Sequence, residues 1–184
     1  MDTISFPSGA LIASNLPSGA SVVYSSSSID ANKKYSSDSQ TLRASVSGKY
    51  AGEFTYDFSS GNLDLSSAVV DVDSVSGKSV IHNLPGSVTS KNLFIPKVSG
   101  ATGAYLCPGA TSISEVSDSC SSKETTGYTS VSIGGTDYWK FTGVTGSGGG
   151  NEGGGSVPEF SDYAMLTILV LVGAAIFGTS KKYI

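Results

Sequence analysis

The stretch SVSIGGTDYWKFTGV, residues 130 to 144, is the strongest local structural signal in this chain. Val131 and Ile133 alternate with serine before the pair Gly134-Gly135, and an aromatic-rich run follows the pair. Two adjacent glycines supply the positive φ angles that a two-residue hairpin turn requires. The stretch therefore predicts two antiparallel β-strands joined by a tight turn.

The sequence on either side of this hairpin also has a β pattern. Aromatic residues alternate in Lys49–Phe58, and apolar residues alternate at both ends of Leu63–Val72. Turn signals such as Pro-Ser-Gly and Pro-Gly recur about every 8 to 12 residues, which is typical of β-sandwiches. Only Thr111–Cys120 could form a short helical turn. Further strands are predicted at residues 9–13, 21–26, 41–47, 79–82, 92–97 and 103–107.

These patterns predict an all-β, β-sandwich-like domain over residues 1–145. The similar segments Asn15-Leu16-Pro17 and Asn83-Leu84-Pro85 allow a second interpretation, in which the domain consists of two small β modules. Coincidence in a chain rich in serine and glycine is the alternative explanation of that similarity.

The composition excludes several classes of protein. Charged residues are 14% of the chain and the net charge is −4, which excludes a basic nucleic-acid binder and a charge-driven disordered chain. One histidine and two cysteines are too few for a tetrahedral zinc site. We therefore predict no metal, no cofactor and no nucleic-acid partner.

The segment Tyr163–Ser180, YAMLTILVLVGAAIFGTS, contains 18 residues without a charge. As a helix it would extend about 27 Å, which is close to the thickness of the hydrocarbon core of a bilayer. Asp162 precedes it, and Lys181 and Lys182 follow it. By the positive-inside rule, this pattern predicts one transmembrane helix with a cytoplasmic basic tail and an extracellular N-terminal domain.

The segment Gly146–Ser156, GSGGGNEGGGS, contains seven glycines in eleven residues. Chain of this composition has few side chains to pack and behaves as a flexible spacer. We therefore predict a flexible glycine-rich linker between the domain and the membrane segment.

Residues 157–184 resemble a known family of sorting signals. Pro158-Glu159-Phe160 is followed by the apolar span and the near-terminal lysines. This order is similar to the archaeal Pro-Glu-Phe C-terminal sorting signal, which archaeosortase-type membrane transpeptidases recognise. The resemblance implies an exported surface protein that is anchored, cut near the motif and transferred to a lipid. An ordinary membrane anchor with a coincidental Pro-Glu-Phe is the alternative.

The first 19 residues do not have the form of a secretory signal peptide, because Asp2 replaces the usual basic region and the apolar run at Ala10–Ala13 is short. The remaining explanations are a signal that was already removed, a fragment that begins at an internal methionine, and a tail-anchored protein. The first two agree with an extracellular domain, and the third does not.

Cys107 and Cys120 enclose twelve residues. Two cysteines at this spacing in a small exported domain predict one disulfide, which requires an oxidising compartment. Free thiols are the alternative.

Candidate catalytic and metal-binding residues are few. His82 is the single possible imidazole base, and we interpret it as an ordinary polar residue at the end of a strand. Asp71-Val72-Asp73-Ser74-Val75-Ser76-Gly77 resembles half of a calcium loop, but the bidentate acid that would complete it is missing. We predict no catalytic residues.

The function predicted from the sequence is that of a non-enzymatic cell-surface protein in envelope structure, adhesion or display. Its predicted partners are the lipid bilayer, an archaeosortase-type transpeptidase, and other surface proteins or glycans. The alternative is a surface-anchored carbohydrate-binding module or a glycoside hydrolase that uses loop carboxylates. Two acids about 5 to 10 Å apart in a cleft would favour the hydrolase.

Overall fold

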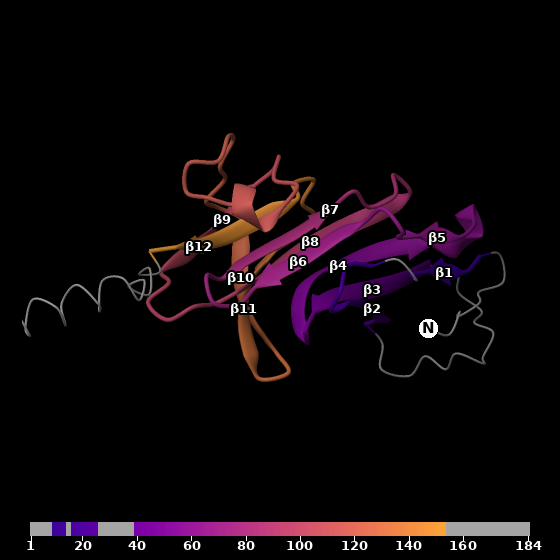
Figure 1. Ribbon diagram of the computed structural model, residues 1–184, viewed down its shortest axis with the longest axis horizontal. Coiled ribbons are helices and arrows are strands. Elements are labelled where there is room, and N and C mark those ends of the chain that lie inside the picture. Colours follow the sequence, from indigo (N-terminus) through magenta and orange to yellow (C-terminus); the bar gives the residue numbers. More distant parts are fainter. Residues whose placement is uncertain (1–8, 14–15, 26–38, 154–184) are drawn as a thin grey trace, which may run out of the picture. The chain divides into compact units, whose positions relative to one another are not determined.

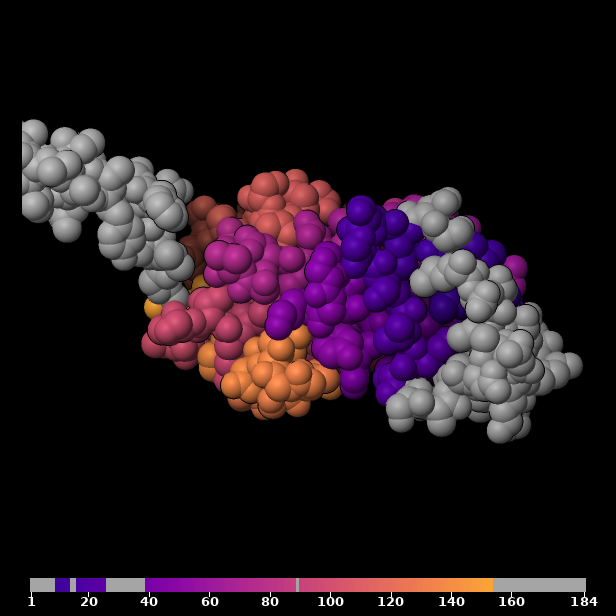
Figure 2. Space-filling view, turned by 60° about the horizontal axis from the view of Figure 1, so that its bottom comes forward, coloured from indigo at the N-terminus to yellow at the C-terminus, as the bar shows by residue number. Residues whose placement is uncertain are grey.

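The computed structural model of the chain describes residues 9–13, 16–25 and 39–153 (Figure 1). All of them belong to the first of two compact units, Met1–Gly154, and the coloured residues of the space-filling view in Figure 2 are among them. The described residues form two short 3₁₀ helices, η1 (Phe58–Ser60) and η2 (Ile113–Glu115). Their strands are β1 (Leu11–Ile12), β2 (Ala20–Tyr24), β3 (Ser39–Val46), β4 (Lys49–Asp57), β5 (Leu63–Asp64), β6 (Val69–Asp73), β7 (Lys78–His82), β8 (Val88–Pro96), β9 (Gly103–Cys107), β10 (Tyr128–Ile133), β11 (Thr136–Phe141) and β12 (Gly148–Glu152).

The strands form two main antiparallel sheets that pack in a β-sandwich-like arrangement. One sheet has the order β10-β11-β8-β4-β3-β2, and the other has the order β6-β7-β12-β9. A short parallel pair, β1 and β5, lies apart from these sheets in the pairing scheme. The prediction of an all-β, sandwich-like domain is confirmed.

The predicted hairpin at residues 130–144 is present as β10 and β11. Ile133 pairs with Thr136, so that Gly134 and Gly135 form the two-residue turn. Both glycines have positive φ angles, 59° and 77°. These angles fit the type of turn whose twist matches that of the flanking strands.

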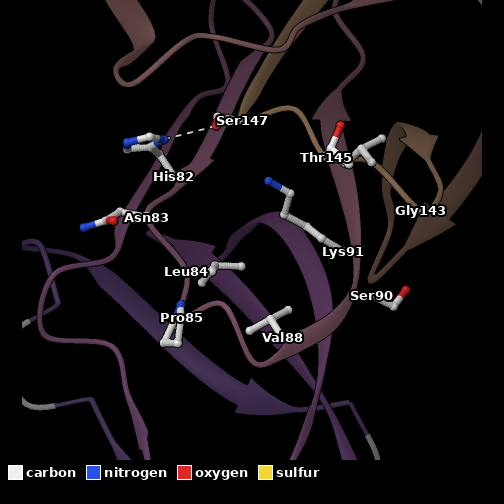
Figure 3. Close-up of a pocket in the computed structure, with 11 residues that line it drawn as sticks. His82, Asn83, Leu84, Pro85, Val88, Ser90, Lys91, Gly143, Thr145 and Ser147 are labelled. Atoms are coloured by element: carbon white, nitrogen blue, oxygen red, sulfur yellow. Dashed lines mark hydrogen bonds between the residues drawn. The ribbon is translucent and has the colours of Figure 1, made fainter.

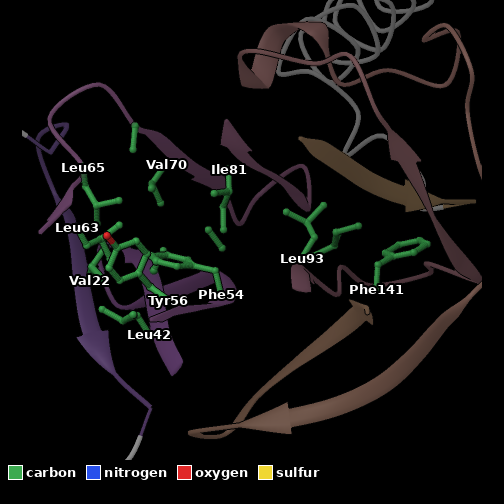
Figure 4. Close-up of a cluster of buried hydrophobic side chains, with 14 of the residues drawn as sticks. Val22, Leu42, Phe54, Tyr56, Leu63, Leu65, Val70, Ile81, Leu93 and Phe141 are labelled. Carbon is green, nitrogen blue, oxygen red and sulfur yellow. The ribbon is translucent and has the colours of Figure 1, made fainter. Parts of the chain in front are cut away.

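The hydrophobic core lies between the two sheets (Figure 4). Phe54 and Leu93 from the six-stranded sheet belong to the same buried cluster as Val70 and Ile81 from the four-stranded sheet. Burial of apolar area at about 25 cal/mol per Å² is the main force that holds the layers together. The largest fully buried side chains are those of Tyr138, Phe54, Phe58, Phe94, Phe141, Leu42, Leu63, Leu65, Ile81, Leu93, Ile95 and Val80.

The expected strand at Leu63–Val72 is divided into β5 and β6. The backbone N–H of Ser66 donates to Asp64 Oδ1, and that of Ala68 donates to the carbonyl of Leu65. An aspartate side chain that bonds to the backbone two residues later closes a local turn, which interrupts the strand.

The prediction of a flexible linker at residues 146–156 is wrong for most of this segment. Gly148–Glu152 is strand β12, which lies inside the four-stranded sheet between β7 and β9. Gly148, Gly149 and Gly150 are buried. The folded body therefore continues to Gly153 rather than ending at residue 145. Residues 154–156 lie outside the described part of the chain.

Strand β12 needs glycine because its neighbours approach its backbone closely on both faces. A Cβ atom at Gly149 would lie 2.6 Å from Ile95 Cδ1 and 2.6 Å from the carbonyl oxygen of Tyr105. On the opposite face, a Cβ atom at Gly148 would lie 2.8 Å from Val116 Cγ2. Such distances leave no room for a side chain, so the glycines permit packing of layers on both sides of the strand.

A disulfide-closed loop covers the outer face of this sheet. The predicted pair, Cys107 and Cys120, is disulfide-bonded in the structure. The loop between them contains η2, in agreement with the expected short helical turn. Its apolar side chains Ala110 and Val116 form a second small core with Val80 of β7.

The predicted sorting signal and membrane helix, residues 157–184, lie outside the described residues. Within the described part of the chain, no helix has the length and apolar character that a membrane span requires.

We predict that Gly149→Ala destabilises the folded domain by about 1 to 3 kcal/mol, the usual cost of overpacking a core. One of the atoms in the way is a backbone oxygen, which cannot rotate aside. The measurement is the free energy of unfolding from urea denaturation.

Gly86→Ala is the matched control, because no heavy atom lies within 4 Å of the Cβ atom it would add. This variant should unfold like the wild type. If Gly149→Ala were as stable as Gly86→Ala, the placement of β12 inside the sheet would be wrong.

Candidate functional site

An open pocket of about 520 Å³ lies at one end of the β7–β8 connection (Figure 3). Its walls come from the end of β7, the connecting residues 83–87, the first part of β8, and residues 143–147, which lead into β12. A pocket of this size falls within the range of small-molecule sites.

Backbone hydrogen bonds hold the segment 143–147 in place as one wall. The N–H of Val144 donates to the carbonyl of Lys91 at 2.8 Å, and the N–H of Ile81 donates to the carbonyl of Ser147 at 2.7 Å. The segment is therefore tied to both sheets, to β8 on one side and to β7 on the other. This attachment makes the pocket a preformed feature of the fold.

His82 and Ser147 form a polar pair in the pocket. His82 Nδ1 lies 3.1 Å from Ser147 Oγ, and Ser147 is buried with 8% exposure. No carboxylate among the described residues hydrogen bonds to His82, so a Ser-His-acid triad is not formed there. The pair presents polar atoms to the pocket.

Lys91 places a cation in the pocket without a neutralising acid. Its Nζ lies 3.4 Å from the carbonyl oxygen of Ile81, and it forms no salt bridge with any described residue. Burial lowers the pKa of the Lys91 ammonium. In Figure 3 the ammonium is directed into the pocket, on the side of His82 and Ser147.

The other charged clusters of the sandwich are neutralised internally. Glu53 is buried and lies 2.6 Å from Arg43 and 3.5 Å from Lys140. Lys123 pairs with Asp118 and Glu152, each at 3.1 Å. Lys91 differs from these cations because its surroundings supply only a carbonyl oxygen.

The remaining walls divide into hydroxyl groups and apolar side chains. The Asn83 side-chain amide donates one hydrogen bond to the carbonyl of Ser67 at the rim. Asn83 also has a positive φ of 57°, which asparagine tolerates better than most residues. The hydroxyl-bearing lining residues are Ser90, Thr145 and Ser147, and the apolar ones are Leu84, Pro85, Val88 and Val144.

Neither of two pockets in the described region contains the carboxylate pair of a glycoside hydrolase. The pocket of Lys91 has no acidic lining residue. A second, smaller pocket of about 220 Å³, which also uses residues 142–146, has Glu124 alone. The arrangement expected for acid–base cleavage of a glycosidic bond is therefore not found in them.

The segment Asp71–Gly77, whose sequence resembles half of a calcium loop, includes the turn between β6 and β7. Asp73 Oδ1 accepts hydrogen bonds from the N–H groups of Val75 and Ser76, and its Oδ2 accepts one from the Ser76 hydroxyl. These bonds lower the pKa of Asp73 and close the turn between β6 and β7. Among the described residues, no cluster of three or more potential ligands is arranged to hold a metal.

Of the candidate catalytic, metal-binding and disulfide residues that the structure describes, only His82 lines this pocket. Cys107 and Cys120 form the disulfide elsewhere in the fold. Pro158, Glu159, Phe160, Lys181 and Lys182 lie outside the described residues. Lys91 and Ser147 were missed because a lysine in a strand and a serine among glycines carry no local signal of a site.

No family model, no curated protein and no solved structure matches this chain significantly.

We predict that Lys91→Met raises the free energy of unfolding by about 1 kcal/mol, because it removes a desolvated cation that no acid compensates. The gain should shrink as the pH rises through the lowered pKa of Lys91, since the wild-type lysine then loses its charge. Urea denaturation at several pH values measures both effects.

Lys97→Met is the comparison, and it should have the opposite sign. Lys97 Nζ lies 3.7 Å from the centre of the Trp139 ring and donates to Ser130 Oγ. A loss of about 0.5 to 1 kcal/mol is expected at such a site. If both substitutions destabilised the protein, Lys91 would be a structural residue.

Proposed function

We propose that this chain is a membrane-anchored surface protein that displays its β-sandwich outside the cell, in envelope structure, adhesion or display. The observation that carries the proposal is the disulfide between Cys107 and Cys120, which closes the loop over the glycine strand β12. Disulfides of this kind persist in oxidising compartments. A domain that depends on one is suited to the cell exterior.

The composition of the C-terminal tail supports anchoring. The 18 uncharged residues of Tyr163–Ser180 and the lysines after them fit a single span with its basic end in the cytoplasm. Pro158-Glu159-Phe160 before the span fits recognition by an archaeosortase-type transpeptidase. On this proposal, the partners of the tail are the lipid bilayer and that enzyme.

A second candidate function is a surface-anchored carbohydrate-binding module. The specific observation in its favour is the pocket at Lys91, which combines hydroxyl groups with apolar side chains. Binding to other surface proteins or glycans would then add a ligand to the display function. The other alternative, a glycoside hydrolase, is not supported by these two pockets, because neither contains a pair of carboxylates.

We predict that protease added to intact cells releases the sandwich as a soluble fragment. Cleavage is expected between Gly154 and Asp162, because the body before this stretch is folded and the stretch itself contains glycines and few apolar residues. In the same cells, Cys107 and Cys120 should resist alkylation until a reductant is added.

A cytoplasmic protein, which must stay intact, is the control for cell integrity. Full protection of the sandwich in unbroken cells, or two thiols that react without reductant, would contradict the proposed topology.

We predict that the double substitution Glu159→Ala and Phe160→Ala blocks processing without blocking membrane insertion. All 18 uncharged residues remain, and insertion depends on their apolar character. In a host that carries the transpeptidase, the variant should accumulate as an uncut form, heavier by about the mass of the residues after the motif. Intact-mass analysis measures this difference.

Ser156→Ala is the control outside the motif, and it should be processed like the wild type. If the double variant and the wild type had the same processing state, the sorting signal would be rejected and an ordinary anchor would remain.

A further inference from the structure

The inference begins from the uncompensated cation of the pocket. Among the residues that line the pocket, Lys91 is the one lysine or arginine, and none is an aspartate or a glutamate. A partly buried ammonium without a counter-charge costs stability, and such costs are usual at binding sites. The missing negative charge is therefore expected on a ligand.

We propose that this pocket binds a small hydroxylated carboxylate, whose carboxylate pairs with the Lys91 ammonium. The proposal is independent of the membrane anchor, because it depends only on side chains of the folded sandwich. It adds a ligand class to the displayed domain.

The charge of the pocket selects a carboxylate over a phosphate. One ammonium balances one negative charge, and the lining contains no arginine. Sites for phosphate dianions usually add an arginine fork or a row of backbone N–H groups at a helix end. Here the two sheet strands and the tied segment 143–147 provide neither a helix end nor a guanidinium group.

The polar walls select a hydroxylated body for the ligand. The hydroxyl groups of Thr145 and Ser147 can each donate or accept, and His82 adds a ring nitrogen beside Ser147. Their spread around Lys91 suits a ligand that carries several hydroxyl groups in addition to the carboxylate.

The apolar wall selects a ligand with a carbon skeleton. Leu84, Pro85, Val88 and Val144 line the same pocket, and in Figure 3 the Leu84 and Val88 side chains lie below the Lys91 ammonium. Contact with C–H groups of a ligand would bury this apolar area. The volume of about 520 Å³ admits one sugar acid or a hydroxy acid of similar size.

The test is isothermal titration calorimetry on the full chain in non-ionic detergent. The probes are D-glucuronate and D-glucose, which share a ring and differ in the carboxylate. We expect D-glucuronate to bind at least ten-fold more tightly than D-glucose, with an affinity that falls as salt is added.

Three variants locate the binding. Lys91→Met should weaken D-glucuronate binding at least ten-fold, and Ser147→Ala should weaken it several-fold. Lys97→Met, which removes a lysine outside the pocket, should leave the affinity unchanged. Circular dichroism checks that each variant is folded. Because Lys91→Met is expected to be more stable than the wild type, a loss of binding in this variant cannot be due to unfolding.

Other results would overturn the proposal. Equal binding of glucose and glucuronate would remove the role of the carboxylate, and full affinity in Lys91→Met would place the site elsewhere. Tighter binding of inorganic phosphate or sulfate would assign the pocket to a different anion. Absence of saturable binding for both D-glucuronate and the smaller hydroxy acid lactate would reject the ligand class.

Discussion

The close approach of neighbouring groups to strand β12 is the constraint on which the rest of the sandwich depends. Ile95 packs against Gly149 on one face of the strand, and Val116 packs against Gly148 on the opposite face. A strand of ordinary residues would hold these layers further apart by the width of its side chains. Because Gly148, Gly149 and Gly150 carry none, Leu93 and Ile95 reach the backbone of β12 directly at Gly149, and the core between the sheets closes over it. The cost is the conformational entropy of ordering glycine, which the two flanking ladders must offset.

The same constraint explains the position of the disulfide. A glycine strand offers no side chains with which to cover its own outer face, so another part of the chain must keep water from the ladders. The loop closed by Cys107 and Cys120 supplies Ala110 and Val116 for this purpose. In the chain-entropy model, closing a loop of this length stabilises the fold by about 3 kcal/mol. The disulfide-closed loop and the glycine strand beneath it are thus parts of one arrangement.

The sequence predicted those parts of the fold in which side chains alternate. The hairpin of β10 and β11 and the aromatic strand β4 were found because each places apolar groups on one face at every second residue. The sequence of β12 predicts a linker rather than a strand, because periodicity is a property of side chains and Gly148–Gly150 has none. The reason why the sequence did not predict the pocket is different. What distinguishes Lys91 is its partial burial in a pocket that has no acidic residue, and this environment exists only after β7, β8 and residues 143–147 have been brought together.

The place of β12 at the end of the described chain also has a mechanical consequence. Its last residue is Glu152, and the segment with the proposed anchor follows in the sequence. Force transmitted from an anchored tail would therefore act first on β12, which is hydrogen bonded to β7 on one side and to β9 on the other. An edge strand is held by one ladder of backbone hydrogen bonds, whereas an internal strand such as β12 is held by two. Lys123 adds a side-chain link at this point through its salt bridge with Glu152. The glycine-rich segment that the sequence predicts as a flexible linker is thus held in the fold by two ladders of hydrogen bonds, whereas an edge strand has one.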